Sequence, residues 1–272
     1  MAATNAGRGS GLVEMRLRAN GLALPPGHTL TTLTERPELE SRVDAHHVGM
    51  WEPFMTESEV ANRMFPRAHA DWPDHQLVLL DASDAVVATS NAMPLAWDST
   101  DADLPESWDE QVLRSAADLD AGRPPTALGA MLIVVGRSSR GGGLSGVMLG
   151  AMQAAGRAAD YRAVIACVRP TEKHRYPLTP IERYAEWLRP DGLPFDPWIR
   201  LHVRLGGRIV RAAPQSMRIR GSVADWEGWT GLSFPDGGPY IVPTATSPVT
   251  IDLDRDEGVY FDQNVWVVHD LG

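Results

Sequence analysis

The stretch ALGAMLIVVGRSSRGGGLSGVMLGAMQAAGRAADYRAVIACV, residues 127–168, decides the fold. Ala127–Val135 is continuously apolar, which is typical of a strand buried on both faces. A glycine cluster follows, then a helix of small residues over Ser145–Ala159, a tight turn and a second apolar run at Ala163–Val168. A strand, a glycine turn, a helix and a second strand in this order predict a βαβ unit.

The glycine turn has the composition of an anion site. In Arg140-Gly141-Gly142-Gly143-Leu144-Ser145, successive backbone N–H groups and a helix N-terminus can together bind phosphate. Glycine permits positive φ and close approach of a ligand, while Arg137 and Arg140 add positive charge. The alternative is a strand–helix turn without a ligand. A P-loop is excluded because no Gly-Lys-Ser/Thr follows, and the GxGxxG spacing is absent.

Upstream of this unit, the sequence predicts a strand, two helices and a hairpin, with Thr34 or a neighbour capping the first helix. The expected bounds are a strand at His28–Leu33, helices at 38–54 and 58–65, and hairpin strands at His75–Leu80 and Ala85–Asn91.

Downstream, Thr179 and Asp196 are expected to cap two helices that each begin with proline. A helix at 106–117 is expected directly before the βαβ unit. The elements expected after the unit are helices at Pro180–Leu188 and Pro197–Leu205, a strand at Arg208–Ala213 and β-like runs in a Trp-rich tail.

Composition narrows the class of protein. The chain has 272 residues and a formal charge of −10, so it is a poor generic binder of nucleic acid or anionic membrane. Its single cysteine, Cys167, excludes an intrachain disulfide and a cysteine-based zinc site, and we expect it to be an inert buried thiol. No apolar stretch is long enough for a membrane helix, and the N-terminus lacks the apolar region of a secretory signal. The sequence therefore predicts a cytoplasmic protein.

The glycine turn resembles the acetyl-coenzyme A site of the GNAT N-acetyltransferase superfamily, whose signature is Arg/Gln-x-x-Gly-x-Gly/Ala after a buried strand. Here the signature is Arg140 to Ser145, and serine in the last position departs from it. The resemblance implies an α/β (α+β) fold with a central mixed, mostly antiparallel sheet, one splayed parallel strand pair and flanking helices. It also implies that the backbone near Ile133 and Val135 holds the thioester, and that the turn amides of Gly141, Gly142, Gly143, Leu144 and Ser145 hold the pyrophosphate.

A second match to this family lies in His202-Val-Arg-Leu-Gly206-Gly207. The family often has Tyr-x-x-x-Gly-Phe here, and its tyrosine protonates the departing coenzyme A thiolate. The resemblance thus implies that His202 is the acid, and an imidazolium suits that role. The alternative is a histidine that packs against the sheet.

The general base has no clear candidate, because no glutamate lies within residues 126–135. Glu172 and His174 follow the second buried strand, where loops of α/β sheets commonly carry function. A solvated connector is the alternative for both. Lys173 and Arg175 could instead contact the 3′-phosphate of coenzyme A or an anionic acceptor.

The acceptor pocket of the family is covered by the N-terminal helices, which here contain His46, His47, Asp71 and Trp72. Adjacent histidines point to different faces of a helix, so we expect no metal there or elsewhere. The acidic segment 98–124 would border this pocket, where it either attracts a cationic amine or is merely a solvated surface.

The function that this resemblance implies is acyl transfer, most simply of acetyl from acetyl-coenzyme A, directly to an amine in a ternary complex. Two alternatives remain open: a donor on acyl carrier protein or aminoacyl-tRNA, and a non-catalytic module that binds acyl-coenzyme A or a protein. A small-molecule amine is the favoured acceptor, no membrane partner is expected, and a homodimer is compatible with the sequence. The implied organisation is a flexible arm at 1–20, an acyltransferase domain at 21–213 and a β-rich extension at 214–272 packed on it.

Overall fold

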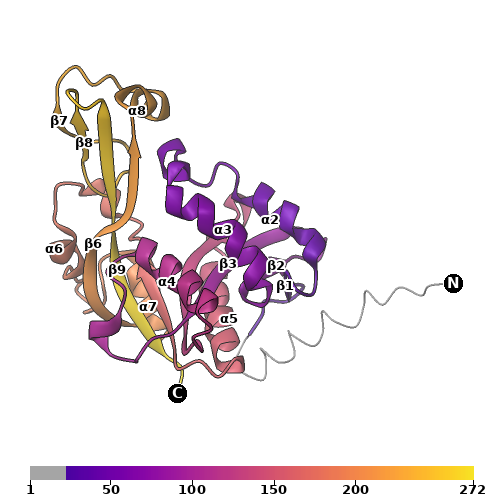
Figure 1. Cartoon of the computed structure of the whole chain (residues 1–272). Coiled ribbons are helices and arrows are strands. Elements are labelled where there is room, and N and C mark those ends of the chain that lie inside the picture. Colours follow the sequence, from indigo (N-terminus) through magenta and orange to yellow (C-terminus); the bar gives the residue numbers. More distant parts are fainter. Residues whose placement is uncertain (1–22) are drawn as a thin grey trace.

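A nine-stranded sheet, in the order β1-β2-β3-β4-β5-β9-β8-β7 with β6 paired to β9, forms the centre of the molecule (Figure 1). The structure is a computed structural model that describes residues 23–272, so the arm expected at 1–20 lies outside the described residues. Within this range, β4 and β5 are the one parallel pair, and the other pairs are antiparallel. The predicted mixed, mostly antiparallel sheet flanked by helices is confirmed.

The strands are β1 (Thr29–Thr32), β2 (Leu77–Leu80), β3 (Val86–Leu95), β4 (Ala127–Val135), β5 (Ala163–Val168), β6 (Arg208–Gly221), β7 (Gly238–Tyr240), β8 (Val249–Asp252) and β9 (Glu257–Asp270). The α-helices are α2 (Glu40–His47), α3 (Glu59–Asp71), α4 (Trp108–Asp120), α5 (Leu144–Ala158), α6 (Ile181–Ala185), α7 (Pro197–Arg204) and α8 (Val223–Thr230). The short 3-10 helices are η1 (Pro37–Leu39), η2 (Pro53–Glu57), η3 (Pro73–His75), η4 (Asp101–Asp103), η5 (Arg137–Ser139) and η6 (Lys173–Arg175).

The parallel pair is short, and its two strands separate beyond it. The last pair in the register is Ala130 opposite Ala166. Met131 is then an extra residue in β4 without a partner on β3, and such a bulge bends its strand and increases the local twist. Beyond the bulge β4 pairs only with β3, and β5 pairs only with β9, so the sheet opens between them.

Helix α4 satisfies the backbone at this bulge. Gln111 Nε2 donates to the carbonyl of Ala130, and Trp108 Nε1 donates to the carbonyl of Met131, both at 3.0 Å. A Cβ on Gly129 would meet the Gln111 amide at 2.8 Å, so glycine is needed for this close approach. The bulge is therefore held from outside the sheet by two buried side chains.

Helices cover both faces of the sheet. On one face, α5 buries Leu144 and Met148 against Leu77 and Leu79 of β2, and α6 and α7 pack beside it over β5 and β9. On the other face, α3 and α4 pack over β3, β4 and β5, with Trp108 in their shared core. Strands β4 and β5 therefore lie between two helical layers (Figure 1).

An outer lobe formed by β7, β8 and α8 sits on the extended ends of β6 and β9, at the top of Figure 1. Its core includes aromatic side chains of α8 and β9 and reaches back to η2. Its buried members include Phe54, Met55 and Tyr260. The lobe is thus packed against the N-terminal segment through η2.

Several predicted elements are confirmed. Strands β4 and β5 have the predicted bounds, and the β2–β3 hairpin, α5 and α7 lie where expected. Asp196 caps α7 as predicted, since its carboxylate accepts hydrogen bonds from the amides of Trp198 and Ile199.

Other local predictions are wrong. Thr34 caps no helix, because the first helical region begins with η1 after Arg36 and then divides into α2 and η2. Pro180, not Thr179, occupies the N-cap position of α6. Helix α8 and strand β8 were not predicted, and β6 runs past residue 213 to Gly221. The division into a domain at 21–213 and an extension at 214–272 stays a prediction. Strand β6 runs across residue 213, and β9 of the expected extension pairs with β5 of the expected domain.

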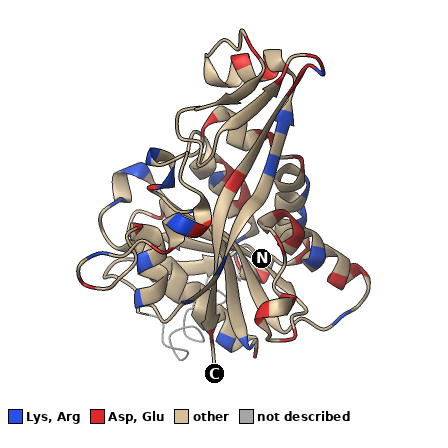
Figure 2. Ribbon diagram, turned by 90° about the vertical axis from the view of Figure 1, so that its left-hand side faces the viewer, with Lys and Arg blue, Asp and Glu red and all other residues tan. Residues whose placement is uncertain are grey.

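In the ribbon of Figure 2, the positions of Lys and Arg are interspersed with those of Asp and Glu. Among residues 23–272, no helix combines the length and the apolar composition needed to cross a bilayer.

Candidate active site

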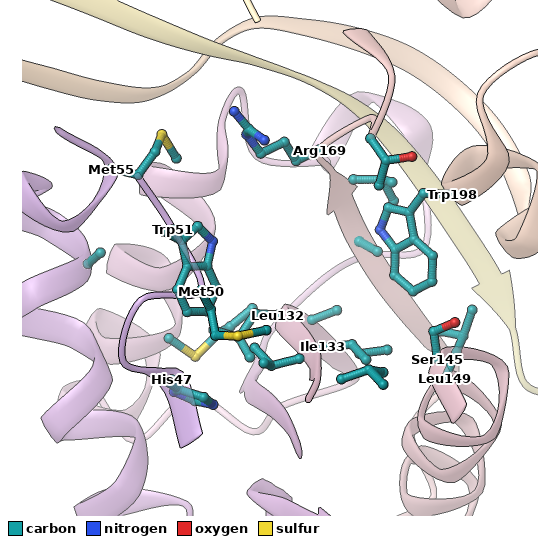
Figure 3. Close-up of a pocket in the computed structure, with 18 of the residues that line it drawn as sticks. His47, Met50, Trp51, Met55, Leu132, Ile133, Ser145, Leu149, Arg169 and Trp198 are labelled. Carbon is teal, nitrogen blue, oxygen red and sulfur yellow. The ribbon is translucent and has the colours of Figure 1, made fainter. Parts of the chain in front are cut away.

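A cavity of about 1000 Å³ lies where β4 and β5 separate. The β4 segment from Ala130 to Val135 and the end of β5 line it, with the glycine turn at one end. The residues after α2 form one wall, where Figure 3 shows Met50, Trp51 and Met55, and Trp198 of α7 stands opposite. The opening in the sheet is therefore a site that reaches from the start of α5 to the outer lobe.

The glycine turn adopts a conformation that requires glycine. Gly141 has φ +84° and Gly143 has φ +76°, and a Cβ at either position would meet nothing within 4 Å. Gly143 is the N-cap of α5 but supplies no side-chain cap. Within the described chain, the amides of residues 141–145 donate to no protein acceptor. The turn therefore offers free N–H groups and open space to a ligand.

The splayed part of β4 also carries free backbone groups. The Gly136 amide donates to Val87 of β3, and alternation along an antiparallel strand then directs the Val134 and Leu132 groups toward β3 as well. The N–H and C=O groups of Ile133 and Val135 consequently point away from β3, into the gap. Both residues line the cavity, as the sequence predicted for the thioester.

The predicted donor-site residues are thus brought together. Ile133, Val135, Arg140, Gly141, Gly143, Leu144 and Ser145 line the cavity, and Gly142 lies within the same turn without lining it. Their roles stay predictions.

His202 also lines the cavity, from α7, and is 2% exposed. Its Nδ1 lies 2.9 Å from Nε2 of His269, whose Nδ1 lies 2.8 Å from Nε2 of Gln153. Gln153 Nε2 also donates to the carbonyl of Leu205, so this atom is the amide nitrogen. We assign the Gln153 amide as the donor to His269 Nδ1, which places the His269 proton on Nε2, where it donates to His202 Nδ1.

This chain of donors leaves the proton of neutral His202 on Nε2, which has no hydrogen-bond partner among the described residues. Burial, and secondly His269, lower the pKa of His202 to about 3. The imidazolium that the sequence suggested is therefore absent at neutral pH. His202 instead offers a neutral N–H donor, packed at 4.6 Å against the Trp198 ring.

Glu172 and His174 lie away from the cavity lining. Glu172 pairs with Arg175 at 2.9 Å, and His174 is exposed on η6 with Nδ1 3.0 Å from the Thr171 carbonyl. Lys173 is fully buried and donates to the carbonyls of Tyr176 and Thr246, so it is not free to contact a phosphate. The structure does not bring the two predicted bases to the other site residues.

Burial lowers the pKa of two histidines in the N-terminal region, His46 and His47. His47 lines the cavity with Nε2 2.8 Å from Thr89 Oγ1, and burial lowers its pKa to about 4. Burial also lowers the pKa of His46. Asp71 pairs with Arg67 outside the cavity lining, and Trp72 does not line it either. Within residues 23–272 no three His, Cys, Asp or Glu side chains are grouped as metal ligands.

The acidic segment 98–124 is largely committed to ion pairs. Its carboxylates at Asp101, Asp103 and Glu106 pair with Arg208, Arg114 and Arg211, respectively. Asp109 differs: burial raises its pKa to about 6, one oxygen accepts the Arg218 amide, and the other has no partner in the described part of the chain. None of these four carboxylates lines the cavity.

One charged residue of the site escaped the sequence analysis. Arg169, directly after β5, projects into the cavity (Figure 3). Asp262 of β9 accepts a hydrogen bond from its Nε at 2.9 Å. An arginine after an apolar strand resembles an ordinary connector, and its partner is far away in sequence. Cys167 lines the cavity as well, but burial raises the pKa of its thiol to about 12, so it stays protonated.

No family model matches the chain. The chain is 30% identical over 287 residues to arginine N-acetyltransferase avaD of Aspergillus versicolor, a match that covers 94% of this chain and 98% of avaD.

Two solved structures share the fold. The loading GNATL domain of CurA from Lyngbya majuscula has a TM-score of 0.56 at 15% identity, covering 90% of this chain and 98% of that domain. The GphF GNAT-like decarboxylase, in complex with isobutyryl-CoA, has a TM-score of 0.54 at 19% identity, covering 89% of this chain and 99% of GphF. Together with the splayed β4–β5 pair and the near full-length match to avaD, they confirm the expected family. The chain belongs to the GNAT N-acetyltransferase superfamily and is an N-acyltransferase, which moves an acyl group from acyl-coenzyme A to an amine.

Proposed function

We propose that this protein transfers acetyl from acetyl-coenzyme A directly to an amino group of a small molecule such as arginine, in a ternary complex. The observation that carries the proposal is the opening between β4 and β5, which joins the glycine turn and the apolar wall near Trp51 in one cavity. The full-length relative avaD is an arginine N-acetyltransferase, which supports arginine as the acceptor.

The donor would lie along β4. Free amides of residues 141–145 suit the pyrophosphate, because oriented N–H groups at a helix N-terminus stabilise negative charge. Free backbone groups at Ile133 and Val135 suit the pantetheine arm and the thioester carbonyl. Donors aimed at the carbonyl oxygen stabilise the oxyanion that develops during attack.

The proposed transfer forms one bond and breaks one bond. The neutral amine attacks the thioester carbon and forms the C–N bond, the C–S bond breaks, and the thiolate departs. The excess proton of the attacking nitrogen passes through water to the thiolate, so atoms and charge balance. His202 would donate a hydrogen bond from Nε2 to the departing sulfur without itself losing the proton.

Formation of acetylarginine tests this function. Purified protein with acetyl-coenzyme A and arginine should release coenzyme A and acetylarginine in equal amounts, measured by thiol titration and mass spectrometry. Release of thiol without an acetylated product, or no turnover with any small amine in the presence of bound acetyl-coenzyme A, would contradict the proposal. Acyl carrier protein and aminoacyl-tRNA would then be the donors to test.

A further inference from the structure

Arg169 occupies the end of the cavity remote from the glycine turn. It directly follows β5, and Figure 3 shows its side chain across the cavity from Ser145 and Leu149 at the start of α5. About 32% of the side chain is exposed. The near surroundings are otherwise apolar or neutral, with Met55, Met217 and Cys167 among the lining residues.

The guanidinium is fixed by a buried network. Asp262 is fully buried and accepts from Arg169 Nε at 2.9 and 3.1 Å, and the Thr244 carbonyl accepts from Nη2 at 3.1 Å. Thr244 has φ +69°, a strained value for threonine that its surroundings must enforce. The Tyr260 side chain is a further hydrogen-bond partner of Arg169, and within residues 23–272 Nη1 donates to no carboxylate or carbonyl oxygen. The plane of the guanidinium is therefore set while part of its donor face stays open.

The carboxylate of Asp262 is not paired with Arg169 alone. Its carboxylate also accepts from Tyr260 Oη at 2.5 Å and from Thr246 Oγ1 at 2.9 Å. The negative charge of Asp262 is thus shared among three donors. An arginine with a supporting shell of this kind is preorganised to bind a planar anion through paired N–H groups.

A complementary acceptor lies on the neighbouring strand. Asn264 of β9 lines the cavity and is 2% exposed. Its Nδ2 donates to the Cys167 carbonyl at 3.2 Å, which identifies the other atom as Oδ1, and this oxygen has no partner in the described chain. A buried acceptor without a partner costs free energy unless a ligand supplies a donor.

We propose that Arg169 binds the carboxylate of the acceptor and that Asn264 Oδ1 accepts a hydrogen bond from its amino group. The substrate class is then an α-amino acid, not the corresponding decarboxylated or amidated amine. This inference rests on the proposed function for its acceptor. A carboxylate entering a largely apolar cavity needs such a charged donor to offset its loss of hydration.

Binding to the coenzyme A-loaded protein tests the subsite separately from turnover. We would titrate arginine, lysine and phenylalanine, each beside its carboxamide, by calorimetry. We expect at least one amino acid to bind roughly 50-fold or more tightly than its amide. This ratio corresponds to the free energy that is lost when a buried charged donor has no partner. If no amino acid binds better than its amide, the inference is overturned.

Variants assign the effect to the residue. Arg169→Gln should bring the amino acid and its amide to within about threefold of one another by weakening only the amino acid, while the Kd for coenzyme A stays unchanged. Arg200→Gln is the matched control, because Arg200 donates to the carbonyls of Pro194 and Phe195 outside the cavity lining and should keep the full ratio. Retained discrimination in Arg169→Gln would also overturn the inference.

Two outcomes keep this inference distinct from the proposed function. If Arg169→Gln fails to fold because Asp262 is left buried and unpaired, Arg169→Lys takes its place. Lysine keeps the charge but should still lose most of the preference for the amino acid over its amide. The comparison of amino acid and amide on the unaltered protein depends on neither variant. If arginine binds through Arg169 yet no acetylarginine forms, the subsite is supported and the proposed function is contradicted.

Discussion

Ala130 of β4 and Ala166 of β5 are the last pair of the parallel register, and the cavity begins where their pairing ends. The bulge at Met131 directly follows this pair, so one extra residue in β4 separates a closed sheet from an open one. Two consequences meet there: the backbone groups of Ile133 and Val135 lose a neighbouring strand, and a ligand gains access to them.

Gly143→Ala should weaken acetyl-coenzyme A binding by about tenfold or more. The φ of +76° strains any residue with a Cβ, and the methyl group would occupy the open space beside the free amides. Calorimetry measures the Kd. Gly150→Ala is the control in the interior of the same helix, where a Cβ meets nothing within 4 Å. It should stabilise the fold by about 0.5–1 kcal/mol and leave the Kd unchanged.

His202→Phe should lower kcat by about 10- to 100-fold and leave the KM for acetyl-coenzyme A within about threefold. The phenyl ring keeps the packing against Trp198 but removes the Nε2 donor. Steady-state kinetics measures the split. His75→Phe replaces a half-buried histidine outside the cavity lining and should not alter kcat. Full activity of His202→Phe would remove this histidine from the mechanism.

Asp109→Asn should raise the free energy of unfolding at pH 8 by about 2–3 kcal/mol, and by much less at pH 4. The folded pKa of about 6 exceeds the ordinary 3.8, mainly because of burial. Asp109 therefore contributes stability below pH 3.8 that is lost as the pH rises through 6. Urea unfolding at both pH values measures this effect. An equal gain at both would show that titration is not its cause.

Asp196→Ala should destabilise the protein by about 2–4 kcal/mol. This carboxylate caps α7, accepts from Tyr184 Oη at 3.0 Å, and accepts the Glu172 amide at 2.8 Å. Asp196→Asn retains one acceptor oxygen and should lose less. Thermal unfolding compares the two, and a smaller loss in the alanine variant would contradict the capping argument.

The parts of this fold that could be predicted are those specified by neighbouring residues. Strands β4 and β5 are apolar runs with sharp ends, and the Asp196-Pro197 pair is a local start signal for α7. The residues proposed for the donor site are neighbours in sequence, at the end of β4 and in the glycine turn. All of them except Gly142 line the cavity, and their role in binding stays a prediction.

The parts that escaped prediction depend on distant partners or on tolerated exceptions. β6 passes Pro214, which ordinarily ends a strand, because a register shift between Ala213 and Met217 accommodates it in a bulge. α8 has a capping box from Ser222 and Asp225, a start signal that is present in the sequence. The Trp-rich composition of this segment favoured strands instead. The Arg169–Asp262 pair joins residues that only the sheet brings together.

We propose above that acetyl-coenzyme A binds in the β4–β5 opening with its pyrophosphate on the glycine turn. Calorimetric titration with acetyl-coenzyme A beside acetyl-pantetheine, which lacks the nucleotide and the pyrophosphate, tests it most directly. We expect micromolar binding of acetyl-coenzyme A and binding at least 100-fold weaker for acetyl-pantetheine, a difference of about 2.7 kcal/mol. Equal affinities, or no binding of acetyl-coenzyme A at millimolar concentration, would contradict the account.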